Sequence, residues 1–137
     1  MTPVETGAEL RKPELANLDA LFRGFADPTR LRLLNAMVPG PLCVSDAVEV
    51  LGLPQPLVSR HLAYLRRVGL VSVERAAKYA RYQLAEPVTP AHASLLSCVR
   101  SCFVAVGMLE TERAAAAGRS AARSSGALDE AEVSRSA

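Results

Sequence analysis

The sequence predicts a mainly α-helical domain that carries one β-hairpin, an α+β fold. A 3.6-residue apolar period runs through residues 55–68, and an alternating pattern runs through residues 70–84. Further helical periods lie before and after these two segments. With 137 residues, half of them hydrophobic, the chain has room for one such domain around one core.

Segment 51–71 predicts a helix with a defined start and stop. Pro54 and Pro56 bracket Gln55, and proline favours a first helical turn because it fixes φ and lacks an amide hydrogen. Gly69 suits the left-handed position that follows a last turn. Apolar residues recur every three or four positions between these ends and predict the inward face: Val58, Leu62, Leu65 and Val68.

The outward face of this helix is small, hydrogen-bonding or cationic, as a helix in a DNA major groove requires. Its residues are Gln55, Ser59, Arg60, Ala63, Arg66 and Arg67. Taken alone, the segment fits equally well an amphipathic surface helix with a solvated basic face. The segment that follows favours DNA binding.

Residues 70–84 alternate apolar and polar positions on both sides of a polar centre and predict a β-hairpin. A helix-turn-helix followed by a hairpin is a winged helix-turn-helix. Residues 54–82 hold six cations and one anion, a local net charge of +5 in a chain whose total is +2. Such a patch attracts DNA phosphates. The cations are Arg60, Arg66, Arg67, Arg75, Lys78 and Arg81.

Three helices are predicted before this pair of elements. The first carries an apolar stripe after a loose arm of residues 1–13; its members are Leu15, Leu18, Leu21, Phe22 and Phe25. Asp27 and Pro28 suit the start of the second helix. Its buried side is predicted to hold Leu31, Leu34 and either Met37 or Val38. A third, short helix runs through Leu51, with Ser45 or Asp46 as its cap.

A last helix is predicted over residues 91–112. Its apolar positions repeat as a heptad: Leu95, Val99, Cys102, Val106 and Leu109. So regular a seam on a small protomer predicts a homodimer formed by the first and last helices. The domain therefore covers residues 14–112, and the Ala/Ser/Arg-rich residues 113–137 are expected to be a disordered tail.

Composition excludes several classes of protein. No apolar run approaches the roughly 20 residues that span a bilayer, and the first fifteen residues are too polar for a signal peptide, so we expect a cytoplasmic protein without a membrane partner. A thiol enzyme needs a base beside its nucleophile. The two histidines, His61 and His92, lie in the predicted DNA-reading helix and near a helix start, where His92 is expected to be a surface residue. We predict no catalytic residues.

Four stretches together resemble the ArsR/SmtB family of bacterial metalloregulatory repressors. They are F-A-D-P-T-R-L-R-L-L at 25–34, L-C-V-S-D at 42–46, Q-P-L-V-S-R-H-L-A-Y-L-R at 55–66 and G-L-V at 69–71. The resemblance covers about residues 15–110. It implies a winged-helix homodimer that occupies operator DNA and leaves it when a thiophilic metal or metalloid binds. It also implies an operator-reading role for Gln55, Ser59, Arg60 and His61. A two-fold dimer spaces its reading helices about 34 Å apart, so the operator is expected to be an imperfect inverted repeat.

The hairpin tip departs from the family. The family has a glycine there, whereas this chain has Ala76-Ala77-Lys78. Alanine adopts positive φ at a cost, so a two-residue primed turn is disfavoured and a looser or shifted wing is expected. On such a wing Arg75, Lys78 and Arg81 are expected to contact phosphates only.

Cys98 and Cys102 are four residues apart, which places them on one face of the last helix. Two or three thiolates suit trivalent arsenic or antimony, so arsenite, methylarsenite or antimonite is the expected inducer and no constitutive cofactor is expected. Cys43 matches the first cysteine of the C-V-C-D-L-C box of arsenite-sensing members, but Ser45 and Ala47 occupy the other two positions. Either Cys43 joins Cys98 and Cys102 as a third metal ligand, or the pair acts as a dithiol and Cys43 is incidental.

Three other interpretations stay open. The cysteines can be small packing residues, since cysteine is welcome on any packed helix. A repressor of the same fold can sense oxidants or persulfide through a bridge from Cys43 to Cys98 or Cys102. A constitutive DNA-binding protein is the third. Zinc is disfavoured because His92 has no second histidine downstream.

Overall fold

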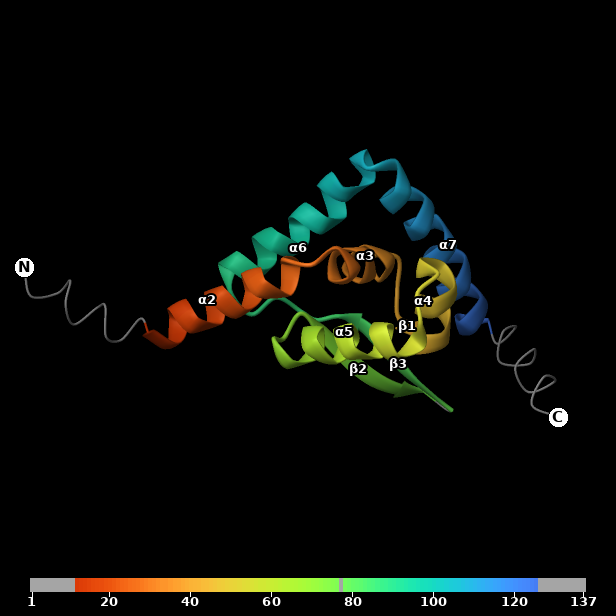
Figure 1. The fold of residues 1–137 in the computed structure, drawn as a ribbon, viewed down its shortest axis with the longest axis horizontal. Coiled ribbons are helices and arrows are strands. Elements are labelled where there is room, and N and C mark those ends of the chain that lie inside the picture. Colours follow the sequence, from red (N-terminus) through yellow and green to blue (C-terminus); the bar gives the residue numbers. More distant parts are fainter. Residues whose placement is uncertain (1–11, 77, 126–137) are drawn as a thin grey trace, which may run out of the picture.

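The computed structural model describes residues 12–76 and 78–125 and confirms a winged helix-turn-helix. In chain order the elements are α2 (Lys12–Phe25), α3 (Pro28–Ala36), β1 (Leu42–Cys43), α4 (Val44–Leu51), α5 (Gln55–Arg67), β2 (Val71–Ala76), β3 (Tyr79–Leu84), α6 (Pro90–Cys102), the 3₁₀ turn η1 (Phe103–Ala105) and α7 (Gly107–Ser124). In Figure 1, α6 and α7 meet at an apex above α3, and α5 and the hairpin lie on the side away from that apex.

The core lies between α3, α5 and the helices around them. Its fully buried side chains are Leu33, Leu34, Val58, Leu62, Leu65 and Val99. Three of the four residues predicted for the inward face of α5 are among them, and the fourth, Val68, is half-buried just after the helix ends. The start of α3 is also as predicted: Asp27 accepts a hydrogen bond from the Arg30 amide at 3.1 Å, and Pro28 occupies the first turn. At the end of α3, Met37 is buried and Val38 is only half-buried.

The predicted hairpin forms and gains a third strand. The antiparallel order is β1-β3-β2, with Leu42 opposite Tyr82. A two-residue strand such as β1 has no readable period. Ala76 pairs with Tyr79, so the loop between the two strands is two residues long. A looser or shifted loop was expected because no glycine stands at the tip. Residue 77 itself lies outside the described residues.

The prediction of a single helix over residues 91–112 is wrong, because α6, η1 and α7 share this range. Val106 is extended (φ −97°, ψ 113°), and this interrupts the helix between η1 and α7. The chain turns by 108° there, at the apex in Figure 1. The expected heptad seam is lost, because Val99 is buried in the protomer's own core and Val106 is 53% exposed at the bend. Among the described residues no single helix is long and apolar enough to cross a bilayer; only the bent pair meets that measure jointly.

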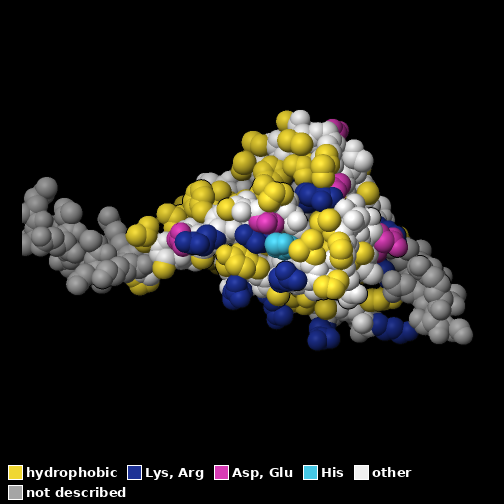
Figure 2. All heavy atoms as spheres, in the orientation of Figure 1, with side chains coloured by type: hydrophobic (Ala, Val, Ile, Leu, Met, Phe, Trp, Pro, Cys, Tyr) yellow, Lys and Arg dark blue, Asp and Glu magenta, His cyan; other side chains and the backbone are white. Residues whose placement is uncertain are grey.

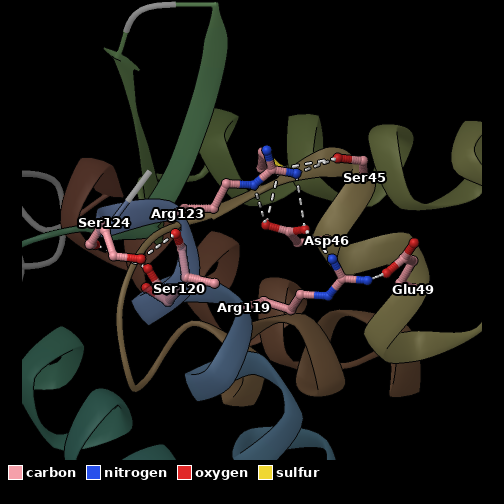
Figure 3. A network of polar contacts seen from close by, with 10 residues as sticks. Ser45, Asp46, Glu49, Arg119, Ser120, Arg123 and Ser124 are labelled. Carbon is pink, nitrogen blue, oxygen red and sulfur yellow. Dashed lines mark hydrogen bonds and ion pairs between the residues drawn. The ribbon is translucent and has the colours of Figure 1, made fainter. Parts of the chain in front are cut away.

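The tail expected from residue 113 is a helix as far as Ser124, and it packs on α3 and α4. Near its start, Arg32 donates to Glu112 at 2.5 Å and Arg113 donates to Asn35 at 3.0 Å. Near its end, arginines of α7 reach acids of α4 (Figure 3). Residues 1–11 of the expected arm and 126–137 of the expected tail lie outside the described residues.

Candidate nucleic-acid interface and thiol pair

Helix α5 presents the predicted outward face to solvent. Gln55 begins the helix and is exposed, as are Arg60, Arg66 and Arg67, while Ser59 is half-buried. The stop is as predicted, since Gly69 adopts a φ of +86°. Figure 2 shows Lys and Arg side chains gathered along the lower edge of the molecule, where α5 and the hairpin lie in Figure 1. This edge can attract a polyanion.

The three wing cations do not share one environment. Arg75 and Lys78 are exposed. Arg81 is half-buried in β3 between Cys43 and Glu74 of the neighbouring strands, and its Nε and Nη2 atoms are buried without a hydrogen-bond partner. Arg75 and Lys78 therefore remain available for phosphate contact, and Arg81 belongs to the sheet.

His61 contacts the protein. Its Nδ1 lies 3.2 Å from Nη1 of Arg30 and 3.8 Å from Oδ2 of Asp27, and its side chain is 15% exposed. With Arg30 as the donor, Nδ1 accepts and the ring hydrogen lies on Nε2. His61 thus ties α5 to the start of α3 within the protomer, and the operator-reading role that the resemblance implied for it stays a prediction.

Arg30 and Tyr64, which the sequence did not single out, lie beside His61. The guanidinium carbon of Arg30 lies 4.2 Å from the ring centroid of Tyr64, and that of Arg67 lies 4.9 Å from the same centroid. Arg30, Tyr64 and Arg67 line a hollow of about 330 Å³ together with Arg60, His61 and Ala63. Arg30 stands within the D-P-T-R stretch, but only the fold brings it to α5.

Cys98 and Cys102 lie on the exposed side of α6, one helical turn apart. Leu96 and Val99 occupy the buried side. The pKa of the Cys98 thiol is raised by partial desolvation, and further by the hydrogen bond and the charge of Cys102. Cys102 also closes α6, next to the bend that leads into α7. Both thiols are free and accessible.

Cys43 is elsewhere, in β1 at the start of α4. It is buried, and its thiol donates to Oδ2 of Asp46 at 3.2 Å and lies 3.2 Å from Oγ of Ser45. Neither Ser45 nor Asp46 caps α4, which begins after Cys43 without a side-chain cap. In residues 12–76 and 78–125 no three cysteine, histidine or acidic side chains gather into a metal-binding group. One protomer therefore does not bring the three cysteines together.

His92 is buried, in contrast to the surface position expected for it. Its Nδ1 accepts a hydrogen bond from the Val88 amide at 3.4 Å, and its own amide donates to the capping hydroxyl of Thr89 at 3.1 Å. Its side chain is 1% exposed, and Nε2 has no hydrogen-bond partner. Burial lowers the pKa of this histidine.

One face of α2 is apolar and exposed. Leu15, Leu18 and Phe22 are 66%, 37% and 55% exposed, whereas Leu21 is buried in the core. A groove of about 410 Å³ runs between α2 and the start of α6, lined by Glu14, Asn17, Leu18, Leu21, Thr89, Pro90 and Ala91. The predicted stripe of the first helix is thus divided between the core and the surface.

Among the known proteins that this chain resembles are bacterial regulatory proteins. Residues 27–73 match the model of the family described as "Bacterial regulatory protein, arsR family". The chain is 44% identical over 66 residues to a probable mercury resistance operon repressor of Streptomyces lividans, covering 48% of this chain and 53% of that protein. It is 41% identical over 75 residues to the arsenical resistance operon repressor of Escherichia coli, covering 54% and 63%. The chain thus spans about half to under two thirds of the length of these relatives.

The fold resembles a solved structure over a longer stretch. Reduced HlyU from Vibrio cholerae superposes with a TM-score of 0.57 and 29% sequence identity, covering 69% of this chain and 98% of that one. The match extends beyond the 47 residues of the family model.

Proposed function

Because the chain belongs to the ArsR family of bacterial regulatory proteins, we propose that it is a DNA-binding repressor that releases its operator when Cys98 and Cys102 bind a thiophilic metal or metalloid. The protein acts as a homodimer through α2 and α6, with α5 in the major groove of an imperfect inverted repeat. The observation that supports sensing most directly is the pair of exposed thiols one turn apart on α6.

For DNA binding, the supporting features are those of α5. Its buried face anchors the helix in the core, and its exposed face offers the amide of Gln55, the hydroxyl of Ser59 and three arginines. Amides and guanidinium groups read base edges in the major groove, and arginines also bind phosphates. Arg75 and Lys78 extend the positive surface onto the wing.

For the inducer, the finer proposal is a trivalent arsenical or antimonite. Arsenite binds by exchange, in which each thiol forms an As–S bond and a hydroxyl of arsenous acid leaves as water. Methylarsenite has two such hydroxyls, so Cys98 and Cys102 satisfy it without a third sulfur. Relatives named for mercury and arsenical resistance support a soft ion. Burial and the bond to Asp46 leave Cys43 outside this site within a protomer.

Release follows from linkage. An ion that binds the DNA-free arrangement more tightly weakens operator affinity by the same factor by which DNA weakens ion binding. Cys102 is the last residue of α6, and α7 begins beyond the turn at 103–105. An ion that joins Cys98 and Cys102 therefore constrains the last turn of α6, directly before the turn that leads into α7.

The test is release of fluorescent promoter DNA during titration with arsenite, methylarsenite, antimonite or lead. C98S and C102S are expected to bind the promoter and to stay bound at concentrations that release the wild-type protein. C43S is the matched control and is expected to release DNA normally. Normal release by C98S or C102S contradicts the assignment of the inducer site, whereas indifference of the wild-type protein to every thiol ligand leaves a constitutive DNA-binding protein.

A thiol redox sensor is the second candidate. It is favoured by the same accessible pair and by a similar fold described in a reduced state. Intact-protein mass spectrometry separates the two candidates: a disulfide removes the mass of two hydrogens, while a bound metalloid adds its own mass.

A further inference from the structure

We propose that the hollow beside α5 holds one backbone phosphate of the bound DNA, so that Arg60 and Arg67 position the protein on the duplex and do not read bases. This inference rests on the proposed DNA binding and specifies which chemical group the site receives. It also gives roles to Arg30 and Tyr64, which belong to no predicted DNA-binding set.

The residues that line the hollow include three arginines and no acid, and the Asp27 carboxylate lies beside His61, 3.8 Å from its Nδ1. The three arginines are Arg30, Arg60 and Arg67. In the described part of the chain none of the three forms an ion pair with a carboxylate. Gathering like charges raises the free energy unless an anion offsets it. Three arginines of α3 and α7 show the contrast, because Arg32, Arg119 and Arg123 each pair with an acid.

The inner wall is held in place before any ligand arrives. Arg30 donates from Nε to the Gly24 carbonyl at 3.0 Å and from Nη2 to the Arg23 carbonyl at 2.7 Å. Its Nη1 contacts His61, and its guanidinium stacks on Tyr64. These contacts fix the guanidinium between the end of α2 and the middle of α5.

Tyr64 also orients Arg67, on the outer wall of the hollow. Arg30 and Arg67 lie over its ring at 4.2 and 4.9 Å, so one aromatic side chain orients two cations. Arg67 and Arg60 are exposed at the mouth of the hollow. Guanidinium groups bind phosphate oxygens with paired N–H donors, so a tetrahedral anion can sit between these two side chains.

The position of the hollow favours a phosphate that belongs to DNA. Arg60, Ala63 and Arg67 line it from α5, and all three also belong to the outward face. A helix in the major groove is flanked by the sugar-phosphate backbone, and contacts to that backbone fix its register. A free phosphate is the competing source of the same chemistry.

The experiment measures DNA affinity against salt concentration for full-length protein, using fluorescence anisotropy with promoter DNA and an unrelated duplex. The R60A/R67A double variant is expected to bind both duplexes about tenfold or more weakly, by the same factor. For this variant, the magnitude of the slope of log affinity against log salt concentration is expected to fall by about two per dimer, because each protomer loses one phosphate contact. R100A removes an exposed arginine of α6 and is the matched control with an unchanged slope. Y64L, which removes the ring and keeps the charges, is expected to lose part of the same affinity.

Methylphosphonate substitution locates the phosphate. At one position in each half-site, a neutral linkage weakens binding of the wild-type protein and has no further effect on R60A/R67A. Additive losses at every position overturn the proposal, as does an unchanged salt slope or a greater loss on promoter DNA than on the unrelated duplex. Saturable shifts of the Tyr64 ring resonances with millimolar inorganic phosphate in the absence of DNA also overturn it, in favour of a free anion. Wild-type protein that shows no preference for its promoter contradicts the proposed function, while the unrelated duplex still tests the hollow.

Discussion

Nε of Arg123 in α7 lies 3.0 Å from Oδ2 of Asp46 in α4, and the two side chains are only 4% and 1% exposed. Nη2 of the same guanidinium donates to Oδ1 at 3.2 Å, which makes the pair bidentate (Figure 3). The thiol of Cys43 donates to Oδ2, and the ring of Tyr79 lies 4.6 Å from the guanidinium carbon. The end of α7 is therefore joined both to α4, the helix that precedes α5, and to the hairpin.

Removal of Arg123 is expected to destabilise the protein strongly. R123A removes the bidentate partner of the buried Asp46 carboxylate and leaves it only the longer contact with Arg119 at 3.5 Å, which costs about 3 kcal/mol of unfolding free energy. The measurement is urea unfolding followed by circular dichroism at fixed protein concentration. E49Q is the matched control, because Glu49 is 51% exposed and pairs with Arg119 at the surface, so its loss costs about 1 kcal/mol or less. Equal midpoints for R123A and the wild-type protein contradict a structural role for α7.

This pair also explains where the sequence-based prediction of the fold stops. The period of α5 and the Asp27-Pro28 start of α3 are local signals, and both elements form as predicted. Helix α7 has no apolar stripe to read, because polar contacts across 77 or 80 residues of chain hold it, such as Arg123 to Asp46 and Arg32 to Glu112. A single-sequence pattern contains no information about such distant partners.

In the candidate site, too, only the features that follow from local helical spacing could be predicted. Helical spacing placed Cys98 and Cys102 on one face of α6, and the outward face of α5 followed from its inward one. The positions of Cys43, His61 and Arg81 could not be derived in this way, because each depends on a neighbour from another element. Arg30 and Tyr64 were missed for the same reason.

The pH dependence of inducer binding should separate a metal cation from arsenite. The raised pKa of Cys98 keeps this thiol protonated at neutral pH. A cation must displace that proton, so its apparent affinity should rise about tenfold per pH unit from Cys98 alone until the pH passes the raised pKa. Arsenite exchanges a hydroxyl for a protonated thiol and releases water, so its affinity should be flat over the same range. Isothermal titration in buffers of different ionisation enthalpy counts the protons released.

The reactivity of the thiols gives a further check on this site. C102A removes the hydrogen bond and the charge of Cys102 and should lower the pKa of Cys98, so alkylation of Cys98 below that pKa becomes faster. Cys43 should react slowly because it is 4% exposed. Peptide mass spectrometry after timed iodoacetamide treatment measures each rate. Alkylation of Cys98 at the same rate with and without Cys102 contradicts the coupling.

Acid should destabilise the protein through His92. Its pKa is lowered by burial in the folded state, so the unfolded chain binds the proton at higher pH than the folded one. The stabilising contribution is complete above the unfolded pKa of about 6.5 and is lost as the pH falls from there towards the folded pKa. H92Q, which keeps a polar side chain without a titrating ring, should show a smaller fall in urea midpoint between about pH 7 and pH 5. An NMR titration of His92 with a midpoint at or above the ordinary histidine value contradicts this account.

The exposed face of α2 should control assembly. Leu18 and Phe22 are 37% and 55% exposed next to the groove between α2 and α6, and burying such a side chain in a partner stabilises the dimer by about 1.5–3 kcal/mol. A two-fold interface contains each residue twice, so L18E or F22E introduces two unpaired charges and should shift the protein to monomers in sedimentation velocity. Operator affinity should fall with it, because a monomer holds only one half-site. V88E is the control, since Val88 is 81% exposed in the loop before α6, where a charge remains in water. Dimers that persist in both α2 variants place the interface on another face and separate DNA binding from this helix.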